Sequence, residues 1–498
     1  MNYDIIFITG EPFSDNPLCG IAILKRLLEK HGYTVGIIIP EKSEDITNLG
    51  KPNLFFGVTS GSIDSMVRNY TPMNKKRIDD PHAKAMPVMP DRAVIVYSNW
   101  IKQHFKDTII VIGGVEASLR RFTHFDYWSN SLRHSILIDA KANLLVYGNA
   151  EKQVLEIAKR VKEGKDLIGI KGTCIKSREL PEGFALLPSH DEVMADKLKF
   201  CDMQNLLTNY KDLGQKDGNF YMLQYKYPDY FSKELDEYYE LPYTREADKS
   251  FLHGFEFSVV THRGCIGGCN FCSLKLLQGD KIVSRSKESI IREVKYLTTL
   301  PNFKGYIDDL GGPAANMYGM DCNKCQNECI KCKNLERSNK RLIELLRELR
   351  KIPKIKKIFI RSGIRYDLAT KEYMKELIDH HISGQLKIAP EHVSEEVLEL
   401  MNKNRGNLKE FIKTFEGLGG KLSFYFMTGH PGSTLKHAEL LGKTLKTLNN
   451  AEAVQLFTPT PMTDSTCMYY TGLNPRTKKP VYIPRTFTEK KEQKRALL

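Results

Sequence analysis

The chain has 498 residues, a formal net charge of +14 and 41% hydrophobic residues, and this length favours two or three domains over a single core. The sequence lacks any run of about 18 uncharged apolar residues, and acidic residues stand near its start where a signal peptide would be basic. These features exclude a membrane-spanning class, and we expect a soluble cytoplasmic protein with no membrane partner.

The first 185 residues alternate short apolar runs with helical patterns. Candidate strands and one amphipathic helix alternate here in the order of a βαβ unit, and glycines follow most of the strands. The runs lie at residues 3–9, 21–31, 35–39, 54–59, 109–112 and 144–147. We therefore expect a doubly wound α/β domain over residues 1–185, with a ligand crevice at the carboxyl ends of its parallel strands.

Two other features of this half have open interpretations. Polar runs at residues 74–80 and 116–127 lie at or beyond candidate strand ends, and they either line a substrate crevice or form ordinary surface ion pairs. Residues 186–250 are crowded with tyrosines and acids and show little periodicity. We expect a connector there, whose aromatic rings pack between domains or stack on a substrate.

A second alternation of strands and helices begins near residue 255. Candidate strands lie at residues 255–260, 305–310, 357–362, 385–389, 422–427 and 453–457. Helical patterns lie between them at residues 288–300, 335–350, 370–381, 395–402 and 435–448. Six such units predict a partial (β/α)6 barrel of the TIM type over residues 251–475, whose chemistry belongs at the carboxyl ends of its strands.

Positive charge is concentrated in two runs. Residues 331–361 carry twelve Lys and Arg against three Glu, and residues 476–498 carry eight against two. The runs suit an anionic partner, or they form a solvated helix face and a basic tail over residues 476–498. Charge runs usually lack a specific partner, so we do not favour a nucleic acid.

Seven of the eleven cysteines fall in two tight groups between residues 265 and 332, a pattern that indicates metal binding. The first group, Cys265, Cys269 and Cys272 in the run CIGGCNFC, follows the first barrel strand. Three thiolates at this spacing can hold three corners of a 4Fe-4S cubane and leave the fourth iron open. An open iron can chelate the amino and carboxylate groups of S-adenosylmethionine (SAM) and pass an electron to its sulfonium.

The competing interpretation of this loop is a zinc site with a fourth ligand such as His262. Zinc sites rarely begin with three cysteines at these spacings, so we favour the cluster. Glycines at 264, 267 and 268 let the loop wrap closely around a cluster, and Phe271 can lie against an adenine.

With its aromatic residue before the third cysteine, the run resembles the signature of the radical SAM superfamily over about residues 251–470. By this resemblance Gly311 and Gly312 help to bind the methionyl end of SAM, although Pro313 stands where members usually have an acid. The resemblance also implies a reductant such as flavodoxin or ferredoxin. Its weaker implications place five other features near the cofactor: Arg361, Ser362, Arg365, Glu391 and the turn at residues 429–432.

A closer likeness covers nearly the whole chain. The runs TPMNKKRIDD, GGVEASLRRF, DLGGPAANMYG, IRSGIRYDLA, LKIAPEH and TPTPMTDSTCMYYTG resemble those of YgiQ-type radical SAM proteins. The likeness implies SAM cleavage to a 5′-deoxyadenosyl radical that acts on a substrate it does not identify.

The second cysteine group comprises Cys322, Cys325, Cys329 and Cys332. On a straight helix these residues would share one face, which cannot surround a metal, so the segment must bend or supply ligands from a loop. A second 4Fe-4S cluster, a structural zinc ion and thiols of another purpose all stay open. Because the group follows the second barrel strand, we expect it at the same barrel end as the first.

A doubly wound domain before such a barrel resembles the cobalamin-binding arrangement. Members that bind cobalt through a histidine show D-x-H-x-x-G, and this chain has Asp15, Pro17 and Gly20, with Pro17 in the place of the histidine. Proline cannot ligate cobalt. Cobalamin bound without a protein ligand stays open as an alternative, but we favour a fold that is kept without the cofactor.

Two rival functions remain beside a radical SAM enzyme with an unidentified substrate. Two metal sites and a basic surface suit a tRNA-modifying enzyme, but only 28 residues follow residue 470, too few for a compact RNA-binding barrel. An iron–sulfur electron carrier is the non-enzymatic alternative, and an open iron argues against it.

Overall fold

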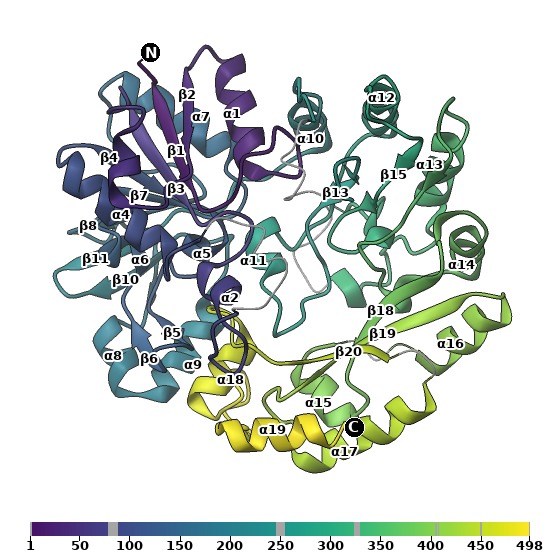
Figure 1. The fold of residues 1–498 in the computed structure, drawn as a ribbon. Helices are drawn as coiled ribbons and strands as arrows, with labels where there is room; N and C mark the ends of the chain where they lie inside the picture. Colours follow the sequence, from purple (N-terminus) through teal and green to yellow (C-terminus); the bar gives the residue numbers. More distant parts are fainter. Residues whose placement is uncertain are drawn as a thin grey trace. The chain divides into compact units, whose positions relative to one another are not determined.

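The computed structural model describes residues 2–77, 88–245, 254–322, 329–403, 406, 408–448 and 451–497. Contacts within the chain divide it into two units, whose elements are labelled in Figure 1. Unit 1 comprises Met1–Asp229, Leu241–His253 and Pro459–Lys479, and unit 2 comprises Tyr230–Glu240, Gly254–Thr458 and Pro480–Leu498. The chain therefore returns to each unit after it has left it.

Unit 1 is built around a nine-stranded sheet whose first five strands are parallel, in the order β2-β1-β3-β4-β7. They are β1 (Ile5–Thr9), β2 (Val35–Ile38), β3 (Phe55–Thr59), β4 (Ile109–Ile112) and β7 (Leu144–Val146). Every residue of β1 and β3 is buried, because a parallel sheet is covered on both faces. The sequence predicted all five strands to within two residues of their observed ends.

Two amphipathic helices cover part of this sheet. Helices α1 (Gly20–Lys30) and α7 (Glu151–Lys162) are in contact with each other, and both can be followed in Figure 1. Leu28 of α1 and Ile157 of α7 share one hydrophobic core with Phe55 of β3. Full burial of such a side chain contributes about 1.5–3 kcal/mol to folding, so this core fixes the sheet on which the strand-end loops stand.

The remaining elements of this part of unit 1 are the 12-residue helix α4 and several shorter helices and strands. They are η1 (Ser43–Thr47), α2 (Ser65–Asn69), α4 (Ala93–His104), α5 (Gly114–Ser118), β5 (His124–Asp126), β6 (Ser131–Arg133), α6 (Ile136–Asp139) and, after the return of the chain, α18 (Asp464–Thr471). Helices α2 and α5 start within a few residues of the ends of β3 and β4, where a doubly wound fold places its ligand crevice.

The sheet continues beyond β7, first within the predicted domain and then into residues 186–250, which the sequence predicted as a connector. Its further strands, in the order β8-β11-β10-β9, are β8 (Thr173–Ser177), β9 (Ala185–Leu187), β10 (Leu213–Asp217) and β11 (Phe220–Gln224), with helices α8 (His190–Ala195) and α9 (Lys197–Leu206). The apolar pattern is weak here because Gln215 and Gln224 are fully buried. Their amides are bonded instead, as Gln215 Nε2 donates to Pro188 O at 2.9 Å and Gln224 Nε2 to Thr208 O at 2.7 Å.

Unit 2 contains the partial barrel. Its strands are β12 (Val259–Val260), β15 (Tyr306–Ile307), β16 (Leu310–Gly311), β17 (Lys357–Ile358), β18 (Gln385–Glu391), β19 (Lys421–Thr428) and β20 (Ala451–Leu456). Parallel pairs join β12 to β16, β15 to β17, and β18 to β19 to β20, and a parallel bridge joins Ile364 to Ile388. With β15 and β16 at one strand position, six parallel strands follow in chain order, which confirms the predicted barrel.

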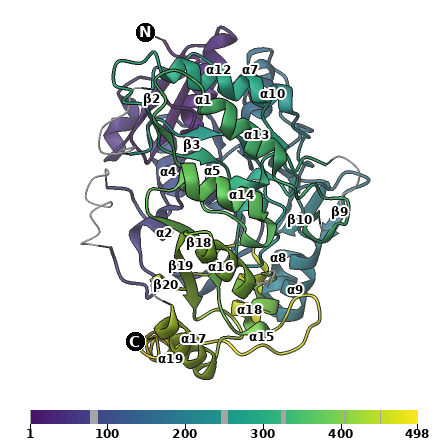
Figure 2. The same ribbon diagram turned by 90° about the vertical axis from the view of Figure 1, so that its right-hand side faces the viewer.

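Helices separate these strands along the chain. They are α12 (Lys287–Leu297), α13 (Lys340–Leu349), α14 (Lys371–Glu376) with the π-helical turn η5 (Leu377–His381), α15 (Glu395–Leu400), α16 (Leu408–Gly417) and α17 (Leu435–Thr447). Figure 2 shows α12, α13, α14 and α16 in succession on one side of unit 2. Five apolar residues of α13 are buried at helical spacing in the core of the unit. The sequence did not predict α16.

Several short elements complete unit 2. They are α10 (Ser232–Tyr239), β13 (His262–Arg263), α11 (Leu274–Gln278), β14 (Val283–Ser284), η2 (Ala315–Met317), η3 (Cys329–Lys331), η4 (Tyr366–Leu368) and α19 (Phe487–Arg495). Helix α19 lies in the predicted basic tail, and its Lys490 and Gln493 are 1% exposed. This part of the tail is therefore a packed helix.

The first barrel strands are shorter than predicted because side chains replace part of the ladder. The Asp309 Oδ1 atom accepts hydrogen bonds from the amides of Arg361 at 2.7 Å and Ser362 at 3.1 Å. The Asp308 Oδ2 atom accepts the amide of Phe257 at 2.9 Å. These carboxylates satisfy backbone donors that a longer strand would satisfy with carbonyls.

Part of the basic run at residues 331–361 is neutralised within unit 2. Arg347 and Arg350 of α13 both pair with the buried Glu376, at 3.2 Å and 2.7 Å. The Nζ atom of Lys357 donates to the carbonyl of Ile382 at 2.8 Å. These three basic side chains therefore have partners within unit 2. Among the described helices, none has the length and apolar character that crossing a membrane requires.

Candidate functional site

The first cysteine group lies on a loop between β13 and α11. The Cys265 amide donates to the carbonyl of Gly279 at 3.0 Å, and the Cys272 amide donates to the carbonyl of Cys269 at 3.1 Å. All three cysteines of the loop are half-buried. The backbone therefore folds the loop back on itself and holds three thiols within eight consecutive residues.

Two glycines are needed for this loop. Gly264 has a φ of +87°, and a Cβ atom there would lie 1.8 Å from the carbonyl oxygen of Lys281. Gly268 has a φ of +63°. Both values lie in the region that other residues rarely adopt, so glycine sets the path of the chain around the thiols.

Residues after α15 anchor the loop from the other side. The Asn270 amide donates to the carbonyl of Met401 at 2.8 Å, and its Nδ2 atom donates to the carbonyl of Leu400 at 2.9 Å. In return Asn402 Nδ2 donates to the carbonyl of Gly268 at 2.8 Å. Sequence reasoning missed Asn402, because a single asparagine after a helix reads as an ordinary helix end.

A buried arginine faces the loop. The Arg365 Nη1 atom lies 3.9 Å from the Cys269 sulfur, while Nε and Nη2 of the same guanidinium contact the Asp367 carboxylate at 3.0 Å and 2.8 Å. Arg365 is 7% exposed. A bidentate pair of this kind fixes the plane of the guanidinium, so a positive charge is held against the thiols.

Burial makes the free thiolates unfavourable. It raises the pKa of Cys265, against the opposing charge of Arg365, and it raises the pKa of Cys272 to about 12. Thiolates in such a place need a metal or another cation beside them. Three thiols on a glycine-rich loop beside a fixed guanidinium are a donor set that fits an iron–sulfur cluster.

Phe271 packs against the end of a helix. Its ring borders a small apolar cluster of Val397, Leu398 and Met401, and it meets the ring of His430 edge-on at a centroid distance of 6.3 Å. His430 is fully buried in the turn after β19, as expected for residues 429–432 near this loop. Burial lowers the pKa of His430, so its ring is neutral.

The predicted glycine pair is held by close packing. A Cβ atom at Gly311 would lie 2.6 Å from Ser362 Oγ, and one at Gly312 would lie 2.7 Å from the ring of His262. Ser362 in turn donates its hydroxyl to Asp309, and Arg361 lies over the ring of Phe359 at 4.8 Å. The structure thus brings Gly311 and Ser362 together at the carboxyl ends of neighbouring strands.

Glu391 ends β18 in a strained conformation. Its φ of +70° is rare for a residue with a side chain, and the residue is 6% exposed. Its Oε1 atom lies 3.6 Å from Lys403 Nζ, and burial raises the pKa of the carboxyl group. The adjacent His392 is 1% exposed, and burial lowers its pKa to about 4. Sequence reasoning did not single out His392.

Gln493 of α19 holds the turn after β19. Its Oε1 atom accepts hydrogen bonds from Thr428 Oγ1 at 3.1 Å, the Gly429 amide at 3.1 Å and Ser433 Oγ at 3.0 Å. Its Nε2 atom donates to the carbonyl of Ser433. One side chain from the end of the sequence thus satisfies both ends of the turn that carries His430.

We expect Gln493→Ala to lower the midpoint of thermal unfolding by several degrees. Four buried partners would lose their hydrogen bonds, at a cost of about 2–4 kcal/mol. Differential scanning calorimetry measures the midpoint, and Lys494→Ala on the exposed side of the same helix is the matched control. Equal midpoints for the two variants would show that the turn does not depend on this side chain.

The second cysteine group lies partly outside the described residues, which include Cys322, Cys329 and Cys332 but not Cys325. Cys329 begins the 3-10 turn η3, and the Cys332 amide donates to its carbonyl at 3.0 Å. Side chains of Cys329 and Cys332 border the same hydrophobic cluster as Cys265. In the described part the two groups are therefore neighbours, as expected from their places in the sequence.

At the carboxyl ends of the strands of unit 1, side chains occupy the space next to two glycines, Gly10 and Gly61. Glu11 accepts hydrogen bonds from the amide and hydroxyl of Ser62 at 2.8 Å and 2.7 Å. A Cβ atom at Gly61 would lie 2.3 Å from Cδ of Glu11, and one at Gly10 would lie 2.5 Å from Cε of Met89. With Pro17 in the place of the cobalt-binding histidine, these residues do not fit a histidine-ligated cobalamin.

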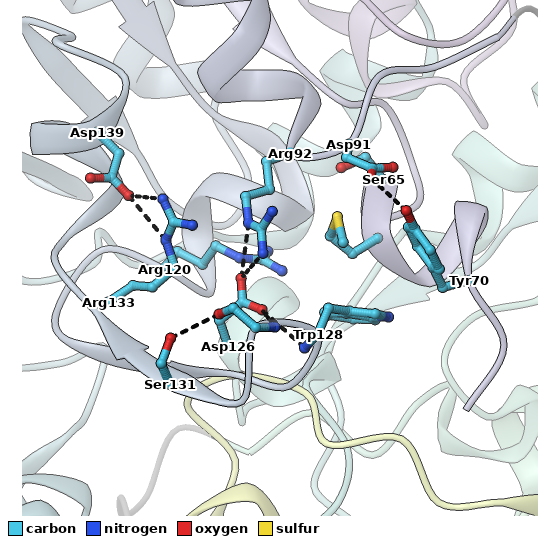
Figure 3. Close-up of polar contacts among 12 residues, drawn as sticks. Ser65, Tyr70, Asp91, Arg92, Arg120, Asp126, Trp128, Ser131, Arg133 and Asp139 are labelled. Atoms are coloured by element: carbon cyan, nitrogen blue, oxygen red, sulfur yellow. Dashed lines mark hydrogen bonds and ion pairs between the residues drawn. The ribbon is translucent and has the colours of Figure 1, made fainter. Parts of the chain in front are cut away.

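The polar run at residues 116–127 forms a network of polar contacts in unit 1, and Figure 3 shows the part of it around Asp126. Arg120 pairs with Asp64, and Arg92 Nε donates to Asp126 Oδ2 at 3.0 Å. The carboxylate of Glu116 accepts the amides of Ser65 at 3.1 Å and Val94 at 3.0 Å. The Arg120–Asp64 pair is buried and the Arg92–Asp126 pair is half-buried, so neither is a fully exposed surface ion pair. In the other polar run, Asp79 and Asp80 lie outside the described residues.

Two family descriptions match the chain in succession. Radical SAM N-terminal matches residues 1–258, and Radical SAM superfamily matches residues 259–444. The chain is 42% identical to a UPF0313 protein of Methanocaldococcus jannaschii, in an alignment that covers 99% of this chain and 88% of that protein. It is 43% identical to a UPF0313 protein of Clostridium botulinum, with 99% and 84% covered.

Two solved structures share the fold. One is TsrM from Kitasatospora setae, a radical S-adenosylmethionine methyltransferase whose structure has cobalamin and a 4Fe-4S cluster bound. Its TM-score is 0.55 at 15% identity, and the match covers 94% of this chain and 79% of that chain. The other is OxsB, a cobalamin-dependent radical enzyme, with a TM-score of 0.52, 13% identity and coverage of 90% and 53%. Unit 1 thus resembles the Rossmann-like domain that precedes the radical SAM domain in these proteins. On the matched regions and the identity to its relatives, the chain belongs to the UPF0313 family of radical SAM proteins, the YgiQ type.

Proposed function

We propose that this protein is a radical SAM enzyme in which Cys265, Cys269 and Cys272 hold a 4Fe-4S cluster. The observation that carries the proposal is the three-thiol loop closed by backbone hydrogen bonds and faced by Arg365. When bound, such a cluster supplies an electron that cleaves SAM to methionine and a 5′-deoxyadenosyl radical. Membership of the superfamily implies the same pair of cofactors.

The protein's own residues hold and shield this centre. Glycines 264 and 268 give the loop its path, and the Asn270 and Asn402 hydrogen bonds tie it to the end of α15. Arg365 offsets negative charge at the thiolates. The apolar cluster that borders Cys265 excludes water, which lowers the local dielectric constant and strengthens the effect of that guanidinium.

Six residues are proposed to contact SAM, and all lie in strand-end segments of the barrel or in the cysteine loop. They are Phe271, Gly311, Gly312, Arg361, Ser362 and Glu391. The Glu391 carboxylate is supported best, because it is buried, it is in a strained conformation and its Lys403 partner is 3.6 Å away. A buried carboxylate so arranged can accept a hydrogen bond from an amino or hydroxyl group of a ligand.

The second cysteine group is proposed to bind a second 4Fe-4S cluster, with structural zinc as the alternative. Cys329 and Cys332 border the same apolar cluster as Cys265, which supports a role in electron relay or substrate binding at this end of the barrel. A low-potential reductant such as reduced flavodoxin or ferredoxin would supply the electron.

Cobalamin is not expected to bind. Pro17 offers no cobalt ligand, and Glu11 fills the approach to Gly61 at the strand-end edge of unit 1. Anaerobic titration of the purified protein with hydroxocobalamin, followed by absorption after gel filtration, tests this expectation. Stoichiometric retention of the corrinoid at micromolar concentration would contradict it.

The proposed function is tested by reductive SAM cleavage. The anaerobically reconstituted protein is reduced with dithionite, and 5′-deoxyadenosine and methionine are measured by chromatography. We expect both products to depend on the protein, the reductant and SAM together. A reducible cluster that leaves SAM intact would instead favour the electron-carrier function.

A further inference from the structure

We propose that His134, His190 and Asp217 form a binding site for a divalent transition-metal ion in unit 1. The three residues come from separate places in the sequence: the turn after β6, the start of α8 and the end of β10. One ligand atom from each, a ring nitrogen or a carboxylate oxygen, lies within 4.8 Å of the other two. The fold thus brings together three ligands that no short sequence motif predicts.

The carboxylate is buried and already faces one imidazole. The Asp217 side chain is 4% exposed, and His134 Nδ1 lies 2.8 Å and 3.0 Å from its two oxygens. Ligand atoms about 2.0–2.2 Å from a tetrahedral metal ion are separated by about 3.3–3.6 Å. Side-chain adjustments of about 1 Å would therefore bring the three residues to coordination distance.

The second imidazole is buried and held by a hydrogen bond. His190 is 7% exposed, and its Nδ1 atom lies 3.0 Å from Thr123 Oγ1. The Thr123 amide donates to Gln215 Oε1 at 2.8 Å, which holds the threonine in place. Metal-binding histidines commonly bond through their other nitrogen in this way, which leaves Nε2 of His190 to bind the ion.

An ordinary ion pair does not account for all three residues. It would explain His134 beside Asp217, but not a second, buried imidazole whose ring nitrogen lies within 4.8 Å of both. The two rings are stacked at a centroid distance of 3.8 Å and an angle of 25°, so one ring must rotate before both nitrogens point at the same ion.

The ligand set indicates the class of metal. Two imidazoles and a carboxylate suit Zn²⁺, Fe²⁺ or Mn²⁺, whereas thiolate and thioether ligands select Cu⁺. The side chain of His134 is 48% exposed, which gives an ion and coordinated water a path to the site. Three protein ligands leave a coordination position for water or a small ligand.

Zinc is the probe for the test. Full-length protein with reconstituted clusters is dialysed anaerobically to equilibrium against micromolar Zn²⁺, and zinc is counted by elemental analysis. The variants are His134→Gln, His190→Gln and Asp217→Asn. The control is His104→Gln, because His104 is the last residue of α4 and its ring bonds to the hydroxyl of Ser43 on η1, outside the proposed site. Zinc held by cysteines is common to all five proteins, so differences between them report the proposed site.

We expect the wild type and the control to hold one zinc ion more than each of the three variants, and zinc to bind the variants at least tenfold more weakly. Thermal unfolding without metal identifies any variant that has lost its fold. Of the three variants, we expect His134→Gln to disturb the fold least, because the His134 side chain is half-exposed. The same zinc content in His134→Gln and the wild type would overturn the proposal.

Discussion

A protein with Cys265, Cys269 and Cys272 all changed to alanine should produce no 5′-deoxyadenosine, yet it should keep about four irons per chain after anaerobic reconstitution. The first group would be gone, while Cys322, Cys325, Cys329 and Cys332 could still hold a complete cluster. The proximity of Cys329 and Cys332 to the cluster of apolar residues around Cys265 supports this assignment. Elemental analysis and Mössbauer spectra measure the number and type of irons that remain.

The same experiment distinguishes the alternatives for the second cysteine group. Near-zero iron with one zinc ion per chain would favour a structural zinc site, in which four thiolates surround the metal as a tetrahedron. Near-zero content of both metals would contradict metal binding at this group. The matched control changes the buried thiols Cys174, Cys201 and Cys467 of unit 1 to alanine and should leave the iron content at the wild-type value.

Arg365→Gln should lower the reduction potential of the first cluster. A unit charge at roughly 5–7 Å in an effective dielectric constant near 20 contributes about 2–3 kcal/mol, and Asp367 offsets part of it. The expected fall is about 50–100 mV, because the reduced cluster carries more negative charge and loses the nearby cation. Redox titration without SAM, followed by electron paramagnetic resonance, measures the potential.

Two further variants distinguish an effect of the Arg365 charge on the cluster from an effect of the substitution on folding. Arg361→Gln removes an exposed cation that contacts the Gly254 carbonyl and Phe359, and it should leave the potential nearly unchanged. Arg365→Gln combined with Asp367→Asn avoids a buried, unpaired carboxylate and should shift the potential in the same direction by less. Equal potentials in the wild type and in both Arg365 variants would mean that the guanidinium does not act on the cluster.

The order of helices and strands could be predicted from the sequence, because the spacing of apolar residues differs between the two. In unit 1 the runs of β1 and β3 are wholly buried, so the hydrophobic signal was continuous. In unit 2 the six strand positions and most helices followed from the same signal. The spacing of Cys265, Cys269 and Cys272 predicted a metal-binding loop, because three thiols on one short loop need no tertiary contact to suggest a metal.

Other features depend on polar contacts between distant residues. Gln215 and Gln224 break the apolar pattern of β10 and β11 because buried amides are satisfied by partners far along the chain. The contact of Asp309 with Ser362 shortens the early barrel strands. The hydrogen bonds between Gln493 and the turn after β19 join residues that are 60 or more positions apart. A single sequence gives no signal for such pairings, because each residue alone reads as a surface side chain.

The ligand group of His134, His190 and Asp217 illustrates the same limit. The three residues are separated by 56 and 27 positions and belong to no short motif. Only the extension of the sheet, which the sequence did not predict, brings the end of β10 near the start of α8, because β10 pairs in parallel with β9, the strand before that helix. A candidate metal site whose ligands are far apart in the sequence is therefore found only from the fold. A candidate site on one loop is found from the spacing of its ligands in the sequence.

The central claim is tested most directly by measuring 5′-deoxyadenosine from SAM in the wild type and in the single variants Cys265→Ala, Cys269→Ala and Cys272→Ala. Cys19→Ala, a change in unit 1 outside both cysteine groups, is the control. The wild type and the control should form the product under dithionite at the same rate, and the three variants should stay at the background of a reaction without protein. Product formation at the wild-type rate in those three variants would contradict the assignment of this loop as the site of SAM cleavage.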